Sequence, residues 1–201
     1  MEILYICLIG YFIGAIPFAY VIGKVFYNTD VRQHGSGNLG GSNTGRVLGK
    51  KAGVSVMALD VFKVVLVVAV ATLLSDIVWA PACGGLAAGL GHCFPVYARF
   101  RGGKAVAALF GLLGGLWLCT EASIWILLVP LAVFFALLFL FKIVSLSSMV
   151  SSVVAVAFAA LMGQHAVTVA ALGCFSVLII WRHRSNIQRI INGTENKVRW
   201  L

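Results

Sequence analysis

The chain has 201 residues, of which 61% are hydrophobic and only 10% are charged, and its formal net charge is +9. That balance excludes an ordinary soluble domain, in which about a quarter of the residues are charged. Apolar runs long enough to cross a bilayer as helices recur along the whole sequence. We therefore expect a single integral membrane domain over 1–201, with an all-α fold organised as a polytopic helical bundle.

The apolar runs predict about seven transmembrane helices. In chain order they cover 3–25, 53–74, 79–96, 105–119, 122–141, 146–162 and 166–181. The third and fourth runs are short and rich in glycine, so these two segments could be tilted, broken or re-entrant. Glu2 replaces the positive start of a signal peptide, and the first run is long enough to span, so we expect this helix to be retained.

Positive charge lies on only one set of connections. Lysines and arginines fall around the first connection (24–51), the third (99–104), the fifth (142) and in the tail (182–199), whereas the alternate connections carry none. One cation, Lys63, stands inside the second apolar run. By the positive-inside rule, this pattern predicts that the tail is cytoplasmic and that the N-terminus lies outside.

The five cysteines form no C-x-x-C pair, and all of them lie in or beside apolar runs. We interpret them as small packing residues rather than as a disulfide or metal framework. The sequence therefore predicts no metal site.

Three polar segments that contain glycine interrupt the apolar chain on the predicted cytoplasmic side. They read HGSGNLGGSNTGRVLGKK (34–51), GHCFPVYARFRGGKAVA (91–107) and WRHRSNIQRIINGTE (181–195). Basic side chains alone could anchor a bilayer surface, but anchoring does not explain the glycines. Glycine lets a backbone approach a ligand or adopt positive φ, and successive N–H groups form anion-binding nests. The segments together predict one site for phosphate-bearing ligands.

Two familiar nucleotide-binding patterns fail in detail. GSGNLG (35–40) matches G-x-G-x-x-G, but the loop lies between membrane runs and not in a βαβ unit. RGGKAV is no Walker A loop, because Ala98 replaces the first glycine and Ala105 replaces the Ser or Thr after the lysine. A nest at Gly102–Gly103–Lys104 could still aim the N-terminal N–H groups of the fourth run at an anion. We expect no nucleic-acid partner.

The three segments resemble, in order and spacing, the motifs of the bacterial acyl-phosphate-dependent glycerol-3-phosphate acyltransferases, which are small integral membrane enzymes. GSGNLGGSN (35–43) is similar to the first motif, GHCFPVYARFRGGKAVA (91–107) to the second and RHRSNIQRIINGTE (182–195) to the third. The chain departs from the usual pattern at Gly41–Ser42, where Ala-Thr is common, and at Ala108, where Thr is common. The His-x4-Asp signature of the other acyltransferase class is absent.

The resemblance implies transfer of a fatty acyl group from acyl phosphate to the 1-hydroxyl of sn-glycerol 3-phosphate. The products would be 1-acylglycerol 3-phosphate (lysophosphatidate) and phosphate, in the first acylation of phospholipid synthesis. The family uses neither acyl-CoA nor acyl carrier protein as donor. The resemblance thus implies no cofactor and no obligate protein partner, and it implies a multi-pass protein of the bacterial inner membrane whose active site faces the cytoplasm.

Both implied substrates carry a phosphate, so we expect two sets of cationic groups in one site. The predicted catalytic residues are Ser36, Arg46, Lys104, His183 and Asn186, and the predicted phosphate-binding residues are Gly35, Gly37, Asn38, Gly40, Ser42, Asn43, Gly102, Gly103 and Arg182. We place the acyl phosphate near the first segment and the glycerol 3-phosphate near Lys104, and the reverse assignment stays open.

Four further residues, Asp60, Lys63, His92 and Glu195, are predicted to support the site. Asp60 and Lys63 share a helix face and could be either a mutually neutralised brace or a functional pair. Glu195 could cap the tail helix or touch a motif arginine. The acceptor of the hydroxyl proton stays open among this pair, His183 and a substrate phosphate.

Alternatives remain for the mechanism and for the protein class. Ser36 could form an acyl-serine or only hold a substrate oxygen. We favour direct transfer, because the donor is already activated and no acid is evidently placed to orient a histidine base. A transporter for a phosphorylated metabolite would suit broken spans, but the outer connections offer little for a second gate. A structural membrane subunit would leave the glycine loops unexplained.

Overall fold

A computed structural model describes residues 1–198, and these residues form ten α-helices and two short 3-10 helices without any β-strand. In chain order the elements are α1 (Glu2–Gly14), α2 (Phe18–Tyr27), η1 (Val31–Gln33), α3 (Gly41–Leu48), α4 (Lys50–Leu74), α5 (Ala80–Cys93), η2 (Val96–Ala98), α6 (Val106–Cys119), α7 (Trp125–Phe141), α8 (Val144–Leu161), α9 (Ala166–Arg182) and α10 (Arg184–Ile191). The predicted all-α class is confirmed. Arg199 of the predicted cationic tail lies outside the described residues.

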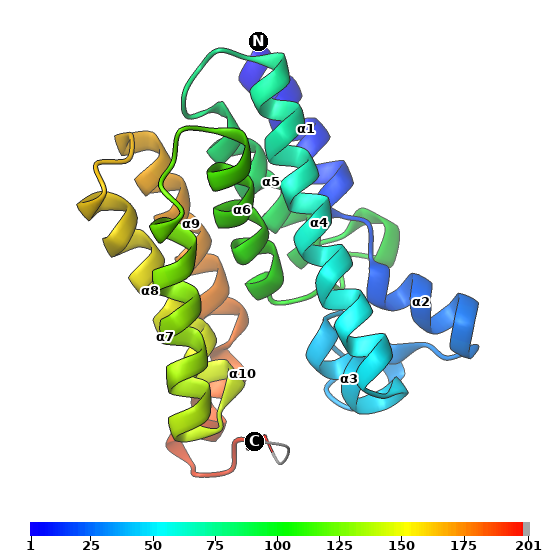
Figure 1. The fold of residues 1–201 in the computed structure, drawn as a ribbon. Coiled ribbons are helices and arrows are strands. Elements are labelled where there is room, and N and C mark those ends of the chain that lie inside the picture. The colour runs from blue at the N-terminus through cyan, green and yellow to red at the C-terminus, as the bar shows by residue number, and fades with distance from the viewer. Residues whose placement is uncertain (199–201) are drawn as a thin grey trace.

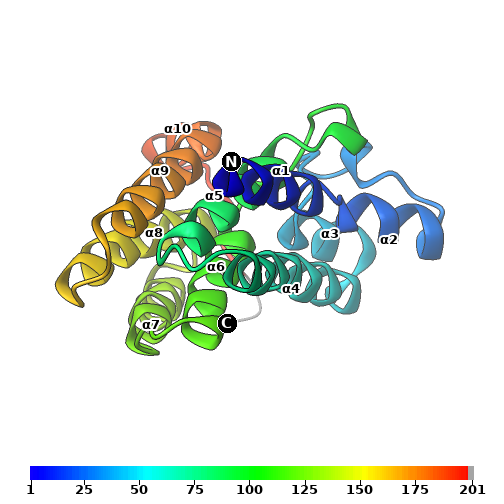
Figure 2. The ribbon, with the colours of Figure 1, turned by 90° about the horizontal axis from the view of Figure 1, so that it is seen from above.

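Helices α1 and α4 to α9 run along one direction with alternating sense (Figure 1). Viewed from above, α5 and α6 lie between the α1–α4 side and the α7–α9 side of the bundle (Figure 2). The helices α2, α3 and α10 lie toward the end of the molecule opposite the N-terminus (Figure 1). The polar segments around these three helices are therefore gathered at one end.

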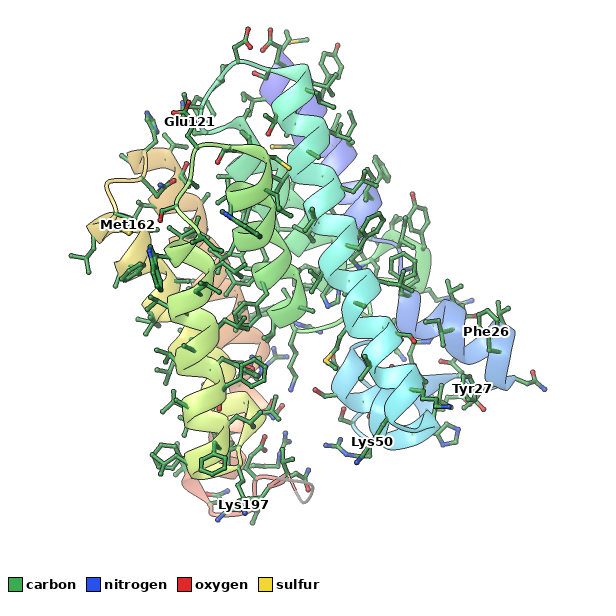
Figure 3. The ribbon with its side chains drawn as sticks, viewed as in Figure 1. Phe26, Tyr27, Lys50, Glu121, Met162 and Lys197 are labelled. Carbon is green, nitrogen blue, oxygen red and sulfur yellow. The ribbon has the colours of Figure 1, made fainter. Side chains whose placement is uncertain are left out.

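The charges follow the same division. Lys50 and Lys197 lie at the end that carries α3 and α10, whereas Glu121 lies at the opposite end (Figure 3). This separation of lysines from the opposite end agrees with the charge pattern of the connections in the sequence. The side of the membrane on which each end lies stays a prediction.

Three stretches of the described chain are long and apolar enough to cross a bilayer: Glu2–Tyr27, Lys50–Leu74 and Val144–Leu161. A fourth is added if α9 and α10, which meet at a 58° bend, are counted as one broken span. Helices α6 and α7 are apolar but shorter, with 14 and 17 residues. Every predicted apolar run coincides with helical structure, and the total of seven crossings stays a prediction.

The first apolar run, predicted over 3–25, lies within one candidate span, Glu2–Tyr27, but this span contains a break. Helix α1 ends at Gly14, and α2 begins at Phe18, directly after Pro17. Proline has no N–H and its ring opposes continuation of the helix, so the break falls there. Beyond the break, α2 leads away from the bundle, and Phe26 and Tyr27 lie at its far end (Figures 1 and 3).

The core depends on small residues that let helices approach closely. Between α1 and α5, a Cβ on Gly14 would lie 2.1 Å from the carbonyl oxygen of Ala88. Larger side chains of α6 and α9, among them Leu112 and Phe175, are fully buried and pack against Gly85 and Gly89 of α5. Close contacts between small residues are the usual way in which helices associate in lipid. This packing explains why the third and fourth apolar runs are rich in glycine.

Candidate active site

The first polar segment folds into a loop followed by α3. Gly35 and Gly37 have φ values of +60° and +69°, a backbone region that favours glycine. Gly41 has a different reason, because a Cβ there would lie 2.2 Å from the side chain of Met57 and 2.7 Å from the carbonyl oxygen of Gly53. The glycines of this segment therefore shape a turn and also allow α3 to pack tightly on α4.

Asn43 organises that loop from the first turn of α3. Its side chain is buried, and its Oδ1 accepts a hydrogen bond from the Ser36 N–H at 2.8 Å. Its Nδ2 donates to the carbonyl oxygens of Val31 at 3.0 Å and His34 at 3.2 Å. The role of Asn43 in the structure is thus to fix the backbone that carries Ser36.

Several polar groups of the first segment remain available to a ligand. Ser36, Ser42 and Arg46 are exposed, and Asn38 is half-buried. Helix α3 has Gly40 as its N-cap and no side-chain hydrogen bond at that position. The N-terminus of a helix favours anions because its first N–H groups lack intrahelical partners. These groups can hold a phosphate without large rearrangement.

The second segment places Gly102 and Gly103 against the end of α5. The Gly103 N–H donates to the carbonyl oxygen of His92 at 3.0 Å. A Cβ on Gly102 would lie 2.2 Å from that oxygen, and one on Gly103 would lie 1.9 Å from His92 Nε2. The predicted anion nest needs correction here, because the Gly103 N–H is already bonded within the protein. The two glycines are required for close packing.

Arg182 holds the same loop from the end of α9. Its Nε donates to the Gly103 carbonyl and its Nη2 to the Gly102 carbonyl, both at 3.1 Å. Its guanidinium also lies 5.5 Å from the centre of the Phe94 ring. Arg182, predicted to bind phosphate, therefore uses two of its five donors to fix the loop that presents Lys104.

Lys104 extends from this loop toward α10, and its Nζ donates a hydrogen bond to Oδ1 of Asn186. Burial lowers the pKa of Lys104 to about 8, the carboxylate of Glu195 partly offsets that effect, and the nearby cations Arg189, Arg182 and Arg46 lower it further. A cation so placed gains strongly from an incoming dianion.

The third segment orients Asn186 through Glu195. Asn186 is buried, and its Nδ2 donates to Glu195 Oε1 at 2.5 Å. The same carboxylate accepts from Ser145 Oγ and Arg189 Nε, each at 2.7 Å. Burial opposes the ionisation of Glu195, but these hydrogen bonds outweigh it and keep the pKa of the carboxyl below its usual value. The predicted contact between Glu195 and a motif arginine is confirmed.

His183 stands at the junction of α9 and α10 and is buried. Its Nδ1 lies 2.8 Å from the carbonyl oxygen of Ile179. Because a carbonyl oxygen only accepts, Nδ1 must carry the hydrogen, and a neutral ring then keeps Nε2 as an acceptor. His183 can therefore hold or receive a proton through Nε2.

The predicted pairing of Asp60 with Lys63 is confirmed. Lys63 Nζ lies 2.7 Å from Asp60 Oδ1, and both side chains are almost fully buried. His92 joins them, with Nδ1 3.1 Å from Lys63 Nζ. Sequence reasoning placed all three residues near the site but did not predict that His92 of α5 contacts the Asp60–Lys63 pair of α4.

Two polar clusters result at the same end of the bundle. One joins Lys104 to Asn186 and Glu195, with Arg182 bonded to the backbone just before Lys104, and the other is the loop held by Asn43. Within the described residues, no hydrogen bond links Ser36 or Asn38 to the first cluster. Sequence reasoning missed Ser145, although the serines at the start of the sixth apolar run offered a signal.

The fold and the site define a helical membrane protein that gathers cations, amides and glycine loops at one end, as a site for phosphate-bearing ligands requires. The family model described as glycerol-3-phosphate acyltransferase matches residues 4–193. The chain belongs to the glycerol-3-phosphate acyltransferase family.

The individual similarities extend over nearly the whole chain. A glycerol-3-phosphate acyltransferase of Bacillus cytotoxicus is 48% identical over 199 residues, covering 98% of this chain and 96% of the relative. The corresponding protein of Geobacillus kaustophilus is 43% identical over 195 residues, covering 97% and 95%.

Two crystal structures of PlsY, an integral membrane glycerol 3-phosphate acyltransferase, have similar folds. Its glycerol 3-phosphate form has a TM-score of 0.90 and 33% identity, covering 98% of this chain and 96% of that one. Its lysophosphatidic acid form has a TM-score of 0.87 and 32% identity, covering 98% and 95%. The integral membrane fold expected from the apolar runs is thus shared with a solved structure.

Proposed function

We propose that the protein transfers a fatty acyl group from acyl phosphate to the 1-hydroxyl of sn-glycerol 3-phosphate, releasing phosphate and 1-acylglycerol 3-phosphate. The observation that carries the proposal is the cluster in which Lys104 bonds Asn186 beside Glu195 and Arg182. Family membership and the two ligand forms of PlsY support the acceptor and the product. The resemblance of the three motifs supports acyl phosphate as the donor.

Each substrate phosphate has a candidate set of groups. Lys104, with Asn186 and the free donors of Arg182, would hold the glycerol 3-phosphate. Ser36 and the N-terminus of α3, with Arg46, would hold the head of the acyl phosphate. The exposed guanidinium of Arg46 could also contact the second phosphate, because an arginine has five N–H donors.

The reaction needs few groups, because acyl phosphate is already activated. The 1-hydroxyl oxygen attacks the acyl carbon, the bond from that carbon to the phosphate oxygen breaks, and phosphate leaves with the bonding electrons. The hydroxyl proton passes to His183 Nε2 or to a phosphate oxygen of a substrate. Ser36 and nearby backbone N–H groups would stabilise the negative charge that develops on the acyl oxygen.

Direct transfer is supported by what surrounds the histidines. A nucleophilic serine needs a base that a third group orients. His183 Nδ1 bonds the carbonyl oxygen of Ile179 and not a carboxylate. Among the described residues, no carboxylate hydrogen-bonds the ring of His34. An acyl-serine would therefore have to form without the usual activation.

The clean separation of charge supports seven membrane crossings, an N-terminus outside, and an active site that faces the cytoplasm from the inner membrane of a bacterium. Only that side would supply both water-soluble glycerol 3-phosphate and a cationic surface. No cofactor and no obligate protein partner are required by this mechanism.

The donor is tested with purified protein, glycerol 3-phosphate and one of three donors: acyl phosphate, acyl-CoA or acyl carrier protein loaded with the same chain. We expect lysophosphatidate and phosphate, in equal amounts, from acyl phosphate alone. Product formed only from a thioester donor would overturn the assignment. Uptake of glycerol 3-phosphate into sealed vesicles without any acylated product would indicate a transporter instead.

The mechanism is tested by mixing the enzyme with radiolabelled acyl phosphate in the absence of acceptor and quenching in denaturant. Direct transfer predicts that no label stays on the protein, together with a large rate loss in Ser36→Ala. Label that is retained by the wild type and lost in Ser36→Ala would establish an acyl-serine and contradict direct transfer.

A further inference from the structure

The buried pair Asp60–Lys63 takes no part in the chemistry above. The exposed fractions of the two residues are 1% and 2%, and they lie within the long helix α4. Removing two charges from water is costly, and a buried ion pair can often be replaced by apolar residues without loss of stability. Ionisable groups inside membrane helices are therefore retained mainly where they do something other than stabilise the fold.

The ammonium group of Lys63 has three acceptors around it. Nζ lies 2.7 Å from Asp60 Oδ1, 3.0 Å from the carbonyl oxygen of Ile16 and 3.1 Å from His92 Nδ1. An ammonium has three N–H donors and no acceptor, so the three contacts satisfy it fully. A charged Lys63 in this position requires an unprotonated Nδ1 on His92, and it pairs with the carboxylate of Asp60, whose Oδ1 also lies 3.4 Å from that nitrogen.

His92 transmits this arrangement to the second polar segment. With Nδ1 accepting from Lys63, a neutral ring carries its hydrogen on Nε2, the edge that faces Gly103. The carbonyl oxygen of His92 also accepts the Gly103 N–H at 3.0 Å. The ring and the backbone of one residue thus hold the loop immediately before Lys104.

The remaining contact of Lys63 leads to the first polar segment. Ile16 stands at the break between α1 and α2, where Pro17 leaves the backbone without a continuing helix. Helix α2 runs from this break into the segment that carries Ser36. The same ammonium therefore holds the backbone just before α2, which leads to the first polar segment, and, through His92, the loop of the second.

We propose that Lys63 is a positioning residue that sets the distance between the two phosphate-binding segments, with Asp60 as the counter-ion that keeps it charged. The identity of the two phosphates rests on the function proposed above. The role differs from that of a simple brace, because a brace could be replaced by any pair that packs equally well.

The test is the double variant Asp60→Leu/Lys63→Met, which removes both charges while keeping the branching of Asp and the length of Lys. Leaving either charge alone in the core would be strongly destabilising, so the single variants are not informative. The matched control is Ser152→Ala/Ser176→Ala. It removes a buried 2.9 Å hydrogen bond between α8 and α9, away from the Lys63 contacts.

We expect the double variant to elute as the wild type does and to melt within a few degrees of it. Its kcat/KM for glycerol 3-phosphate should fall at least about tenfold, because small displacements of binding groups cost large factors in rate. The control should keep wild-type kinetics. A well-folded double variant whose kcat/KM stays within about twofold of the control would overturn the positioning role.

A second variant keeps the question decidable if the double variant does not fold. His92→Asn retains an acceptor near the position of Nδ1 for Lys63, but it removes the ring edge beside Gly103. We expect this protein to fold and to show a raised KM for glycerol 3-phosphate. Unchanged kinetics in His92→Asn would contradict transmission through the ring.

Hydrogen exchange provides a readout that does not depend on the reaction. In the Asp60→Leu/Lys63→Met protein, or in His92→Asn if the double variant does not fold, amides of 100–106 should exchange faster than in the wild type. In the double variant, amides of 15–20 should exchange faster too. Neither segment should change in the serine control.

If the wild type had no acyltransferase activity, the proposed function would fail, but the exchange result would still decide whether Lys63 has the positioning role. Unaltered exchange in these segments would overturn that role whatever the activity.

Discussion

Asn43 holds the backbone of Ser36 across the glycine loop, with the Ser36 N–H donating to Asn43 Oδ1 at 2.8 Å. The same side chain donates to the carbonyl oxygens of Val31 and His34, so one amide closes three hydrogen bonds in a buried position. The loop that interrupts the apolar chain is therefore ordered from within before any ligand arrives.

Asn43→Asp should damage the site although it changes only one atom. The aspartate can still accept from Ser36, but its second oxygen would face the carbonyl oxygens of Val31 and His34. Each donor bond lost at a buried position costs about 1–3 kcal/mol. We expect a lower melting temperature and a large loss of turnover. Asn→Asp at the exposed Asn192 is the control and should leave the melting temperature and the turnover unchanged. If Asn43→Asp changes them just as little, Asn43 does not order the loop.

The pH dependence should reveal Lys104. Its pKa is lowered to about 8, chiefly by burial, so the ammonium to which we assign phosphate binding is lost as the pH rises through that value. We expect kcat/KM for glycerol 3-phosphate to fall above about pH 8, because this ratio reports the free enzyme. Lys104→Arg should be slower but should lack this decline, since a guanidinium stays charged. If kcat/KM of Lys104→Arg falls above pH 8 as it does in the wild type, the decline belongs to a group other than Lys104.

Gly103→Ala should be strongly disruptive. Its Cβ would lie 1.9 Å from His92 Nε2, so the loop would have to move and would carry Lys104 with it. We expect an increased KM for glycerol 3-phosphate and faster proteolysis of the 94–105 connection. Gly173→Ala is the matched control, because nothing lies within 4 Å of a Cβ at that helical position. If Gly103→Ala and Gly173→Ala have similar kinetics, a side chain at position 103 does not displace the loop that carries Lys104.

The orientation is tested by single cysteines in a background without Cys7, Cys83, Cys93, Cys119 and Cys174. Cysteines at the exposed positions 76 and 121 should react with an impermeant thiol reagent added to intact cells. A cysteine at the exposed position 51 should react only after the membrane is opened. Labelling of position 51 from outside would overturn the proposed arrangement.

Local patterns predicted part of this site correctly. Asp60 and Lys63 are three residues apart, so helical geometry alone brought them together. The partner His92 lies in another helix, and no spacing rule connects it to them. The contact of Ser145 with Glu195 was missed for the same reason, since it depends on how the start of α8 lies beside the segment that follows α10.

The glycines show a second limit of sequence reasoning. Gly35 and Gly37 have the positive φ that a glycine-rich loop suggests, whereas Gly41, Gly102 and Gly103 are explained by neighbours that only the folded structure supplies. Hydrophobicity identified the first apolar run but could not place the break within it, because a run of apolar residues does not distinguish one helix from two. Pro17 is the local signal that marks the position of the break.

The lengths of α5 and α6 have a consequence for the surrounding lipid. Each helix has 14 residues, which at about 1.5 Å per residue gives roughly 21 Å, well short of a hydrocarbon core of about 30 Å. The 94–105 connection, with Lys104 at its end, would therefore sit deeper than the headgroups unless the bilayer thins around it. Bilayer thickness then becomes a variable of catalysis, and lipids with longer chains should place the two phosphates farther from water.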